Sequence, residues 1–161
     1  MSKKISTSIT FLILISMILT SCKKYSEGPF FSFRTAEQRL LGTWEIKEFK
    51  IDGQDFMDSL SMDSAFCTYL FERIKSDSRE YYRSCPGGFY LYFWGYWHLE
   101  NKNKELWLDE YNSNYNSPTY GPLGRNEDIC WTILRLKNKE MKLKTDWNGK
   151  EYEIFFDKIK D

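Results

Sequence analysis

The most reactive side chains of this 161-residue chain are its four cysteines, Cys22, Cys67, Cys85 and Cys130. A thiol can bind a metal ion, form a disulfide bond or carry an acyl group. Spacings of 18 and 45 residues separate the last three cysteines, and these match no C-x2-C metal pattern. We therefore expect no metal site and interpret these three residues as disulfide candidates.

The other polar residues give no pattern of a catalytic site. His98 is the single histidine, and it has no Cys or Ser beside it. Asp52, Asp55, Asp58 and Asp63 miss the spacing of a calcium loop and suit turns and helix starts instead. The chain also lacks the nucleophile elbow, the phosphate-binding glycine loops and the H-E-x-x-H zinc motif. We expect a protein that is not an enzyme and uses no cofactor.

An export signal occupies the start of the chain. Lys3 and Lys4 form a positively charged region, and residues 11–19 form an apolar one that only Ser16 interrupts. This apolar run is shorter than the about 20 residues that cross a bilayer as a helix. The pattern predicts a signal peptide over residues 1–21 that is removed during export.

The run Leu19-Thr20-Ser21-Cys22 resembles the lipobox of bacterial lipoproteins. The resemblance implies cleavage before Cys22 and attachment of acyl chains, palmitate among them, to that residue. Two or more chains give a stable membrane anchor. We therefore expect a lipid-anchored protein of the bacterial cell envelope, at the outer rather than the inner membrane, with residues 22–34 as a lipidated tether. An ordinary secretory signal with a chance cysteine nearby is the alternative.

The mature chain, residues 22–161, has the size of one domain with a real core. Removing residues 1–21 takes away two lysines and no acids, which leaves 21 basic and 23 acidic residues and a formal charge of −2. This near-neutral balance argues against nucleic acid as a partner. Disulfides persist outside the cytoplasm. We favour a Cys67–Cys85 bridge, because both residues lie on segments expected to be neighbouring strands, with the third cysteine left as a buried thiol.

Secondary-structure signals predict a β-rich domain over residues 35–161. Thr35 and Gln38 fit a capping box that starts a short helix, which stops at Gly42. Eight or nine strands follow, nearly all joined by hairpin turns such as Asn148-Gly149. No helix of crossover length separates them, which excludes parallel pairing. A meander hides its edges by closing, so the predicted fold is an all-β, antiparallel, up-and-down barrel of about eight strands.

Three local features are predicted within this meander. A slip in the apolar alternation near Glu48 indicates a β-bulge in the first strand. The apolar residues of segment 54–62 are spaced as in a short amphipathic helix, which would cover one end of the barrel. Gly95 is expected to mark a second bulge.

Aromatic residues supply the candidate contacts for a ligand or a partner. Segment 89–97 carries them on both faces, so one row is expected to point outward as a patch, unless helix 54–62 or the tether covers it. Segment 111–126 has no periodic apolar face and is long enough for a functional loop. The candidate contact residues are Trp44, Tyr90, Tyr92, Trp94, Trp97, Tyr115 and Tyr120.

Gly42-Thr43-Trp44, at the start of the meander, resembles the Gly-x-Trp motif of lipocalins. The layout of residues 38–158 is similar to the lipocalin-like domains of bacterial lipoproteins. The resemblance implies a barrel whose closed end holds Trp44 under a basic side chain, with Arg135 and Lys158 as candidates. It also implies a small hydrophobic ligand inside the barrel. The alternative is a solid barrel that serves as a protein-interaction module in the cell envelope.

Overall fold

The computed structural model describes residues 25–27, 33–58, 67–74, 78–85, 91–111, 122–123 and 127–161. A short helix precedes a series of strands, and every pair of neighbouring strands is antiparallel. In chain order the elements are α2 (Ala36–Leu40), β1 (Gly42–Ile51), β2 (Gln54–Asp55), β3 (Thr68–Arg73), β4 (Arg79–Cys85), β5 (Leu91–Glu100), η1 (Asn101–Asn103), β6 (Glu105–Tyr111), β7 (Asp128–Leu136), β8 (Glu140–Trp147) and β9 (Lys150–Lys160).

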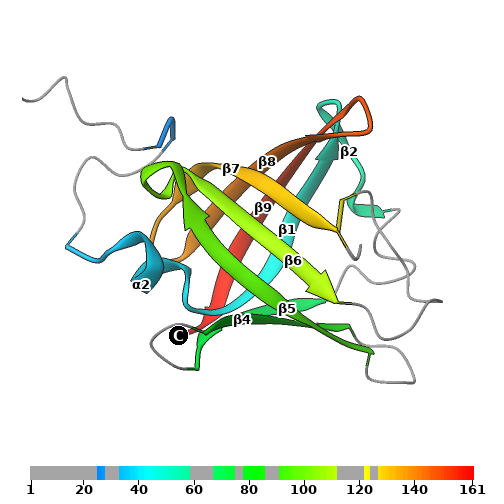
Figure 1. Cartoon of the computed structure of the whole chain (residues 1–161). Coiled ribbons are helices and arrows are strands. Elements are labelled where there is room, and N and C mark those ends of the chain that lie inside the picture. The colour runs from blue at the N-terminus through cyan, green and yellow to red at the C-terminus, as the bar shows by residue number, and fades with distance from the viewer. Residues whose placement is uncertain are drawn as a thin grey trace, which may run out of the picture.

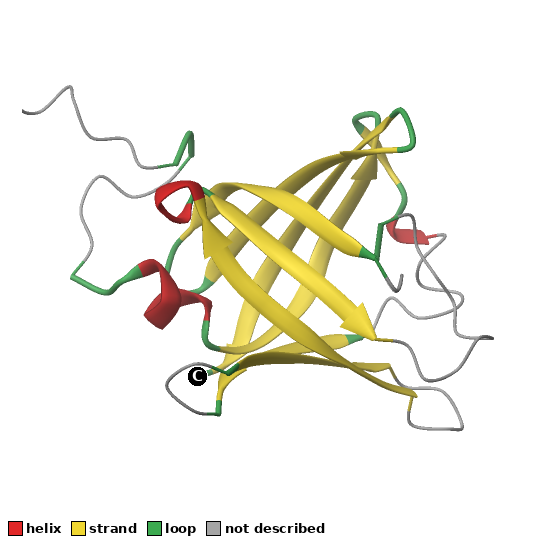
Figure 2. Ribbon diagram, in the orientation of Figure 1, coloured by secondary structure: helices red, strands yellow, loops and turns green. Residues whose placement is uncertain are grey.

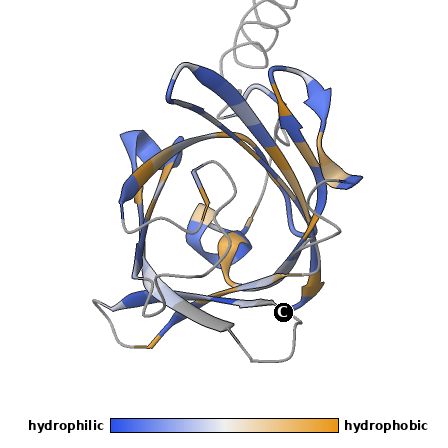
Figure 3. Cartoon of the chain, turned by 90° about the vertical axis from the view of Figure 1, so that its right-hand side faces the viewer, coloured by the Kyte–Doolittle hydropathy of each residue, from blue (hydrophilic) through white to orange (hydrophobic). Residues whose placement is uncertain are grey.

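The strands close into a barrel. From β3 to β9 they follow one another in chain order, and β1 pairs with both β3 and β9. Eight strands thus form the barrel, while the two-residue strand β2 pairs with the end of β1. Figures 1 and 2 show the strands inclined around a common axis, and Figure 3 looks along that axis from the end opposite α2. The predicted all-β meander barrel is confirmed.

Helix α2 begins at the predicted capping box. The backbone N–H of Gln38 donates to Thr35 Oγ1 at 3.1 Å, and the backbone N–H of Thr35 donates to Gln38 Oε1 at 2.9 Å. These two bonds satisfy N–H groups that the first turn of a helix leaves without partners. The helix lies across one end of the barrel, which we call the closed end (Figure 3).

Trp44 is fully buried beneath this helix at the closed end. Its indole Nε1 donates to the carbonyl of Leu40 at 2.8 Å. Lys158 Nζ lies 4.8 Å from the Trp44 ring centroid and donates to two carbonyls at the end of α2, at 2.8 and 2.6 Å. Lys158 is therefore the basic residue beside this tryptophan, whereas Arg135 pairs with Glu140.

Two local features of the strands agree with the prediction, the turn between β8 and β9 and a bulge in β1. Asn148 and Gly149, between β8 and β9, both have positive φ, 50° and 75°. Asn and Gly tolerate this left-handed conformation, which a type I′ hairpin requires. In β1 the register against β9 shifts between Ile46 and Glu48, which confirms the bulge predicted there.

One further local prediction is right only in part, and another is wrong. Gln54 and Asp55 form strand β2, because the turn before them directs the chain back along β1, whereas Met57 and Asp58 are helical; residues 59–62 of the predicted helix lie outside the described residues. At Gly95 the register of β4 against β5 is continuous, so there is no bulge. Glycine is required there because a Cβ atom would lie 2.1 Å from the carbonyl oxygen of Asp109 and 2.7 Å from the Tyr81 ring.

Part of the predicted tether packs on the barrel. Tyr25 is buried, and the backbone N–H of Glu27 donates to the carbonyl of Leu134 in β7 at 2.9 Å. The Glu27 carboxylate also pairs with Arg135 at 3.0 Å and with Lys142 at 3.3 Å. The predicted tether, segment 22–34, is therefore bound to the barrel at Tyr25 and Glu27 and is not a free linker from end to end. Within the described part of the chain, no helix is long and apolar enough to cross a membrane.

Candidate binding surface

Outward-facing side chains of β3 to β6 form an apolar row that crosses four strands. Pairing places Leu70 opposite Tyr82, Tyr82 opposite Trp94, and Trp94 opposite Tyr111. Side chains alternate between the two faces of a strand, and the described neighbours of these residues along each strand point into the core. We call the outer face of β3 to β6, with Leu70, Tyr82, Trp94, Tyr96 and Tyr111, the aromatic wall.

Three rings of the aromatic wall contact one another on the solvent-exposed outer face of the barrel. Trp94 stacks on Tyr111 with centroids 5.2 Å apart, and Tyr96 meets the two rings edge-on at 5.7 and 6.0 Å. Trp94, Tyr96 and Tyr111 nevertheless remain 42%, 42% and 44% exposed. Large aromatic residues are usually buried, so a contiguous exposed group of this kind is typical of an interaction site.

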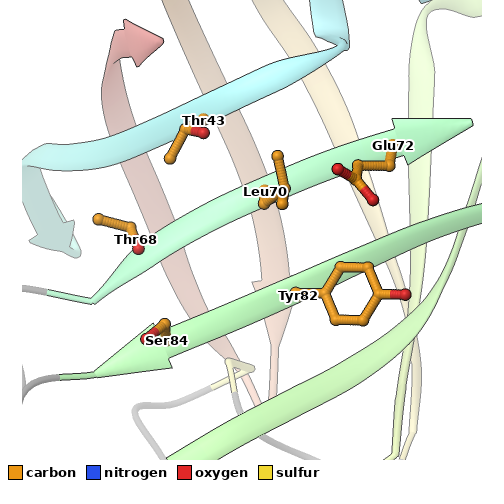
Figure 4. A pocket seen from close by; sticks show the side chains of 6 residues that line it. All are labelled: Thr43, Thr68, Leu70, Glu72, Tyr82 and Ser84. Atoms are coloured by element: carbon orange, nitrogen blue, oxygen red, sulfur yellow. The ribbon is translucent and has the colours of Figure 1, made fainter.

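A hollow of about 360 Å³ adjoins this row where β1, β3 and β4 meet (Figure 4). Its lining residues occupy outward positions on their strands, so the hollow lies on the outside of the barrel. Tyr82 borders both the hollow and the aromatic rings, which makes the two features one continuous surface. The lining residues are Thr43, Thr68, Leu70, Glu72, Tyr82 and Ser84.

Carboxylates hold two of the wall tyrosines. The hydroxyl of Tyr82 donates to Glu80 at 2.6 Å, and this bond raises the pKa of Tyr82 to about 12. A hydrogen bond to Asp109 also raises the pKa of Tyr111 above its ordinary value. Both phenols therefore stay protonated near neutral pH and present neutral rings beside negative charge.

The barrel interior contains a buried ion pair. Arg83 Nη2 and Glu110 Oε1 are 2.7 Å apart, with side chains only 1% and 5% exposed. Tyr81 donates to the other Glu110 oxygen at 2.9 Å. Burial raises the pKa of the Tyr81 hydroxyl well above its usual range, and the Glu110 carboxylate raises it further. Sequence reasoning missed this group, because an isolated charge on a strand gives no sign that it faces inward.

The space beside this ion pair is small. A void of about 10 Å³ lies among Tyr81, Glu110, Leu123 and Trp131, which suits one water molecule rather than an organic ligand. Leu123 belongs to the predicted functional loop and is buried here. The indole N–H of Trp131 has no hydrogen-bond partner among the described residues.

The predicted contact residues fall into three groups. Trp44 and Trp97 are core residues, and Trp97 Nε1 donates to the carbonyls of Glu72 and Glu80 at 3.2 and 3.0 Å. Trp94 lies on the aromatic wall, as predicted. Tyr96 and Tyr111 of the same wall were not predicted from the sequence. The remaining predicted contacts, Tyr90, Tyr115 and Tyr120, lie outside the described residues, as does the side chain of Tyr92.

The cysteines differ in state and position. Cys67 is buried and disulfide-bonded, whereas Cys130 is a half-buried free thiol whose pKa is raised by burial. Thr68 pairs with Ser84 across β3 and β4, so the adjacent backbone positions 67 and 85 face each other. The side chain of Cys85 and the whole of Cys22 lie outside the described part of the chain, so the Cys67–Cys85 bridge stays a prediction.

The other polar candidates have structural roles. His98 is exposed on β5 and stacks on Trp107 with centroids 6.0 Å apart. Carboxylate oxygens of Asp52 and Asp55 each accept a backbone N–H bond at 2.9 Å, as turn residues do. The described residues contain no group of three or more His, Cys, Asp or Glu side chains that could hold a metal ion. Asp63 lies outside those residues.

Comparison with solved structures shows which kind of barrel this is. A lipocalin-like protein from Bacteroides uniformis matches 75% of this chain and 99% of its own with a TM-score of 0.54 and 17% identity. An uncharacterized protein from Bacteroides eggerthii matches 73% of this chain and 98% of its own with a TM-score of 0.47 and 20% identity. No protein-family model and no curated protein matches the sequence. At 17% identity the first match establishes the fold alone.

Proposed function

We propose that this lipocalin-like barrel is a lipid-anchored protein of the bacterial envelope that binds a partner protein through its aromatic wall. The observation that carries the proposal is the exposed, mutually contacting group of Trp94, Tyr96 and Tyr111. Trp and Tyr dominate the binding energy of protein interfaces, because they cover large areas and lose few rotamers on binding.

The rigidity of the wall supports this reading. Trp94 and Tyr96 stand on β5, which pairs with β4 on one side and β6 on the other at both positions, and Tyr111 pairs with Trp94. Little conformational entropy is therefore lost when a partner covers these rings. The neighbouring hollow at Leu70 and Tyr82 gives a partner side chain a place to insert. Pockets of this kind beside aromatic anchors are where interface hot spots cluster.

Photo-crosslinking in intact cells tests the proposal. A benzophenone amino acid at Tyr96 should crosslink a distinct protein, whereas the same group at Ile159 on β9, which is 50% exposed, should not. Substituting Trp94 and Tyr111 by Ser should abolish the Tyr96 product without lowering the protein level. Equal products from Tyr96 and Ile159, or none from Tyr96, would count against a partner on this wall.

A small hydrophobic ligand inside the barrel is the second candidate. The observation in its favour is the buried Trp131 N–H, which has no partner among the described residues and could donate to a ligand oxygen. Because the void of about 10 Å³ beside Trp131 suits only one water molecule, such a ligand would have to displace neighbouring side chains. Denaturing extraction of the purified protein followed by mass spectrometry should then release a copurifying lipid. Repeated absence of such a molecule, with no binding of a hydrophobic dye, would leave the outer wall as the binding surface.

The membrane anchor is tested separately. Cys22→Ala should leave a larger, unprocessed precursor without acyl chains, because the lipobox resemblance assigns both cleavage and acylation to Cys22. Gel mobility and metabolic labelling with palmitate measure the two effects. Acylation of the Cys22→Ala protein would contradict the assignment.

A further inference from the structure

Negative charge is concentrated on the aromatic wall and along its border with β7. Described outward-facing positions of β3 to β6, together with the first residue of β7, contain six acidic residues and no Lys or Arg. Arg73 and Arg79 lie on the same strands, but they pair with Glu37 of α2 at the closed end. The six acidic residues are Glu72, Glu80, Glu100, Glu105, Asp109 and Asp128.

These acids oppose one another directly across the strands. The pairing places Glu72 opposite Glu80, Glu100 opposite Glu105, and Asp109 opposite Asp128. Like charges in directly opposite positions destabilise a sheet. Within the described residues, no Lys or Arg forms an ion pair with any of the six. His98 Nε2 lies 3.3 Å from a carboxylate oxygen of Glu100, and neutral donors such as Tyr82 and Asn101 bind Glu80 and Glu105. The repulsion between the opposed acids is therefore not balanced by any Lys or Arg of the described residues.

The opposite side of the barrel shows the contrasting arrangement. There, acids that face each other across strands are bridged by bases, as when Lys144 binds Glu151 beside Asp146. Lys47 likewise pairs with Asp157 at 2.8 Å. The unbridged acids are therefore a local property of the aromatic wall rather than of the whole surface.

We propose that the partner on the aromatic wall is a protein segment rich in Lys and Arg. This inference rests on the proposed function and adds the chemistry of the partner. Arg and Lys side chains would pair with the opposed carboxylates, and their cations would lie over the Trp94, Tyr96 and Tyr111 rings, which attract positive charge at their faces. An apolar side chain of the same segment would enter the hollow at Leu70.

The outer face of β8 in a second copy does not supply this chemistry. Lysines that face outward from β8 are already bound within the chain, Lys142 to Glu27 and Glu153, and Lys144 to Glu151. These pairs would have to break before that face of a second copy could bind the wall. A different protein with unpaired bases avoids that cost.

Neutralisation of the opposed acids tests the inference in the full-length, membrane-bound protein. Asp109→Asn/Asp128→Asn should reduce the Tyr96 crosslink about tenfold, because interfacial charge pairs set both affinity and association rate. The matched control is Glu45→Gln/Asp146→Asn, which removes two exposed carboxylates from β1 and β8 and should leave the crosslink unchanged. The first variant should also unfold at a higher temperature, which shows that it remains folded.

The crosslinked segment of the partner identifies the chemistry directly. Peptide mapping should place Lys or Arg beside the attachment point, and a synthetic peptide of that segment should bind more weakly as NaCl rises from about 50 to about 300 mM. A crosslink that survives neutralisation, or a segment without bases, would overturn the basic partner while leaving the aromatic wall as a binding surface. Absence of any crosslink from position 96 when Asp109 and Asp128 are both present would instead refute the proposed function itself.

Discussion

The buried Arg83–Glu110 ion pair gives a quantitative test of how the barrel interior is stabilised. We expect Glu110→Gln to lower the free energy of unfolding by about 3–5 kcal/mol, because it leaves a buried guanidinium without the carboxylate that lies 2.7 Å away. Glutamine keeps the shape of the side chain, and its oxygen can still accept the Tyr81 hydroxyl. The loss therefore reports the missing charge rather than a cavity.

Urea unfolding of the mature chain, followed by tryptophan fluorescence, measures this loss. With a slope of about 2 kcal/mol per molar urea, the transition midpoint should fall by about 1.5–2.5 M. A domain of this size has a total stability of about 5–15 kcal/mol, so the variant should still fold at low temperature unless the protein is among the least stable.

A second variant separates charge burial from general damage. Tyr81→Phe/Arg83→Met/Glu110→Leu removes every polar group of the cluster, and apolar replacements of a buried ion pair are often close to neutral. It should therefore be more stable than Glu110→Gln alone. The reasoning is refuted by a Glu110→Gln loss below about 1 kcal/mol, or by a triple variant that is less stable than the single one.

Three further predictions concern single residues. Gly95→Ala should cost about 3 kcal/mol or more in a thermal melt, because its methyl group would lie 2.1 Å from a carbonyl oxygen of β6; an unchanged melting temperature would contradict the packing described there. Alkylation of the exported protein, denatured without reductant, should label Cys130 and leave Cys67 and Cys85 unlabelled until reduction. Tyr82→Phe should remove an ultraviolet-detected ionisation near pH 12; since this pKa is raised from 10.0, the stabilisation by the hydroxyl is complete below pH 10 and is lost as the pH rises through 12.

The sequence predicted those parts of the fold that short-range signals determine. The capping box at Thr35 and Gln38 and the turn at Asn148-Gly149 each depend on residues that are close in the chain, and both are present. The segment after Asp52 was predicted only in part. Its apolar spacing indicated a helix, and Met57 and Asp58 are helical, but pairing with β1 makes Gln54 and Asp55 a strand.

The aromatic wall was predicted only in part, because its composition depends on register. Trp94 could be identified from the alternation within its own segment. Tyr82 on β4 and Tyr111 on β6 lie beside Trp94 because of how β5 pairs with these two strands. A shift of one residue in either pairing would point their side chains into the core. The ion pair of Arg83 and Glu110 could not be predicted for the same reason: the two residues lie 27 positions apart in sequence, and only the strand register brings them together.

With the anchor proposed at Cys22, the packing of Tyr25 against the barrel would determine how far the domain can stand from a membrane. Only Lys23 and Lys24 separate it from Cys22, so an acyl group on Cys22 would lie within about 11 Å of the docked residue even with the chain fully extended. The segment would then act as a short spacer that keeps the barrel at a fixed distance from the lipid, rather than as a flexible linker. A partner embedded in the same membrane would meet the barrel by diffusing in two dimensions, at a local concentration far above that of a protein free in solution.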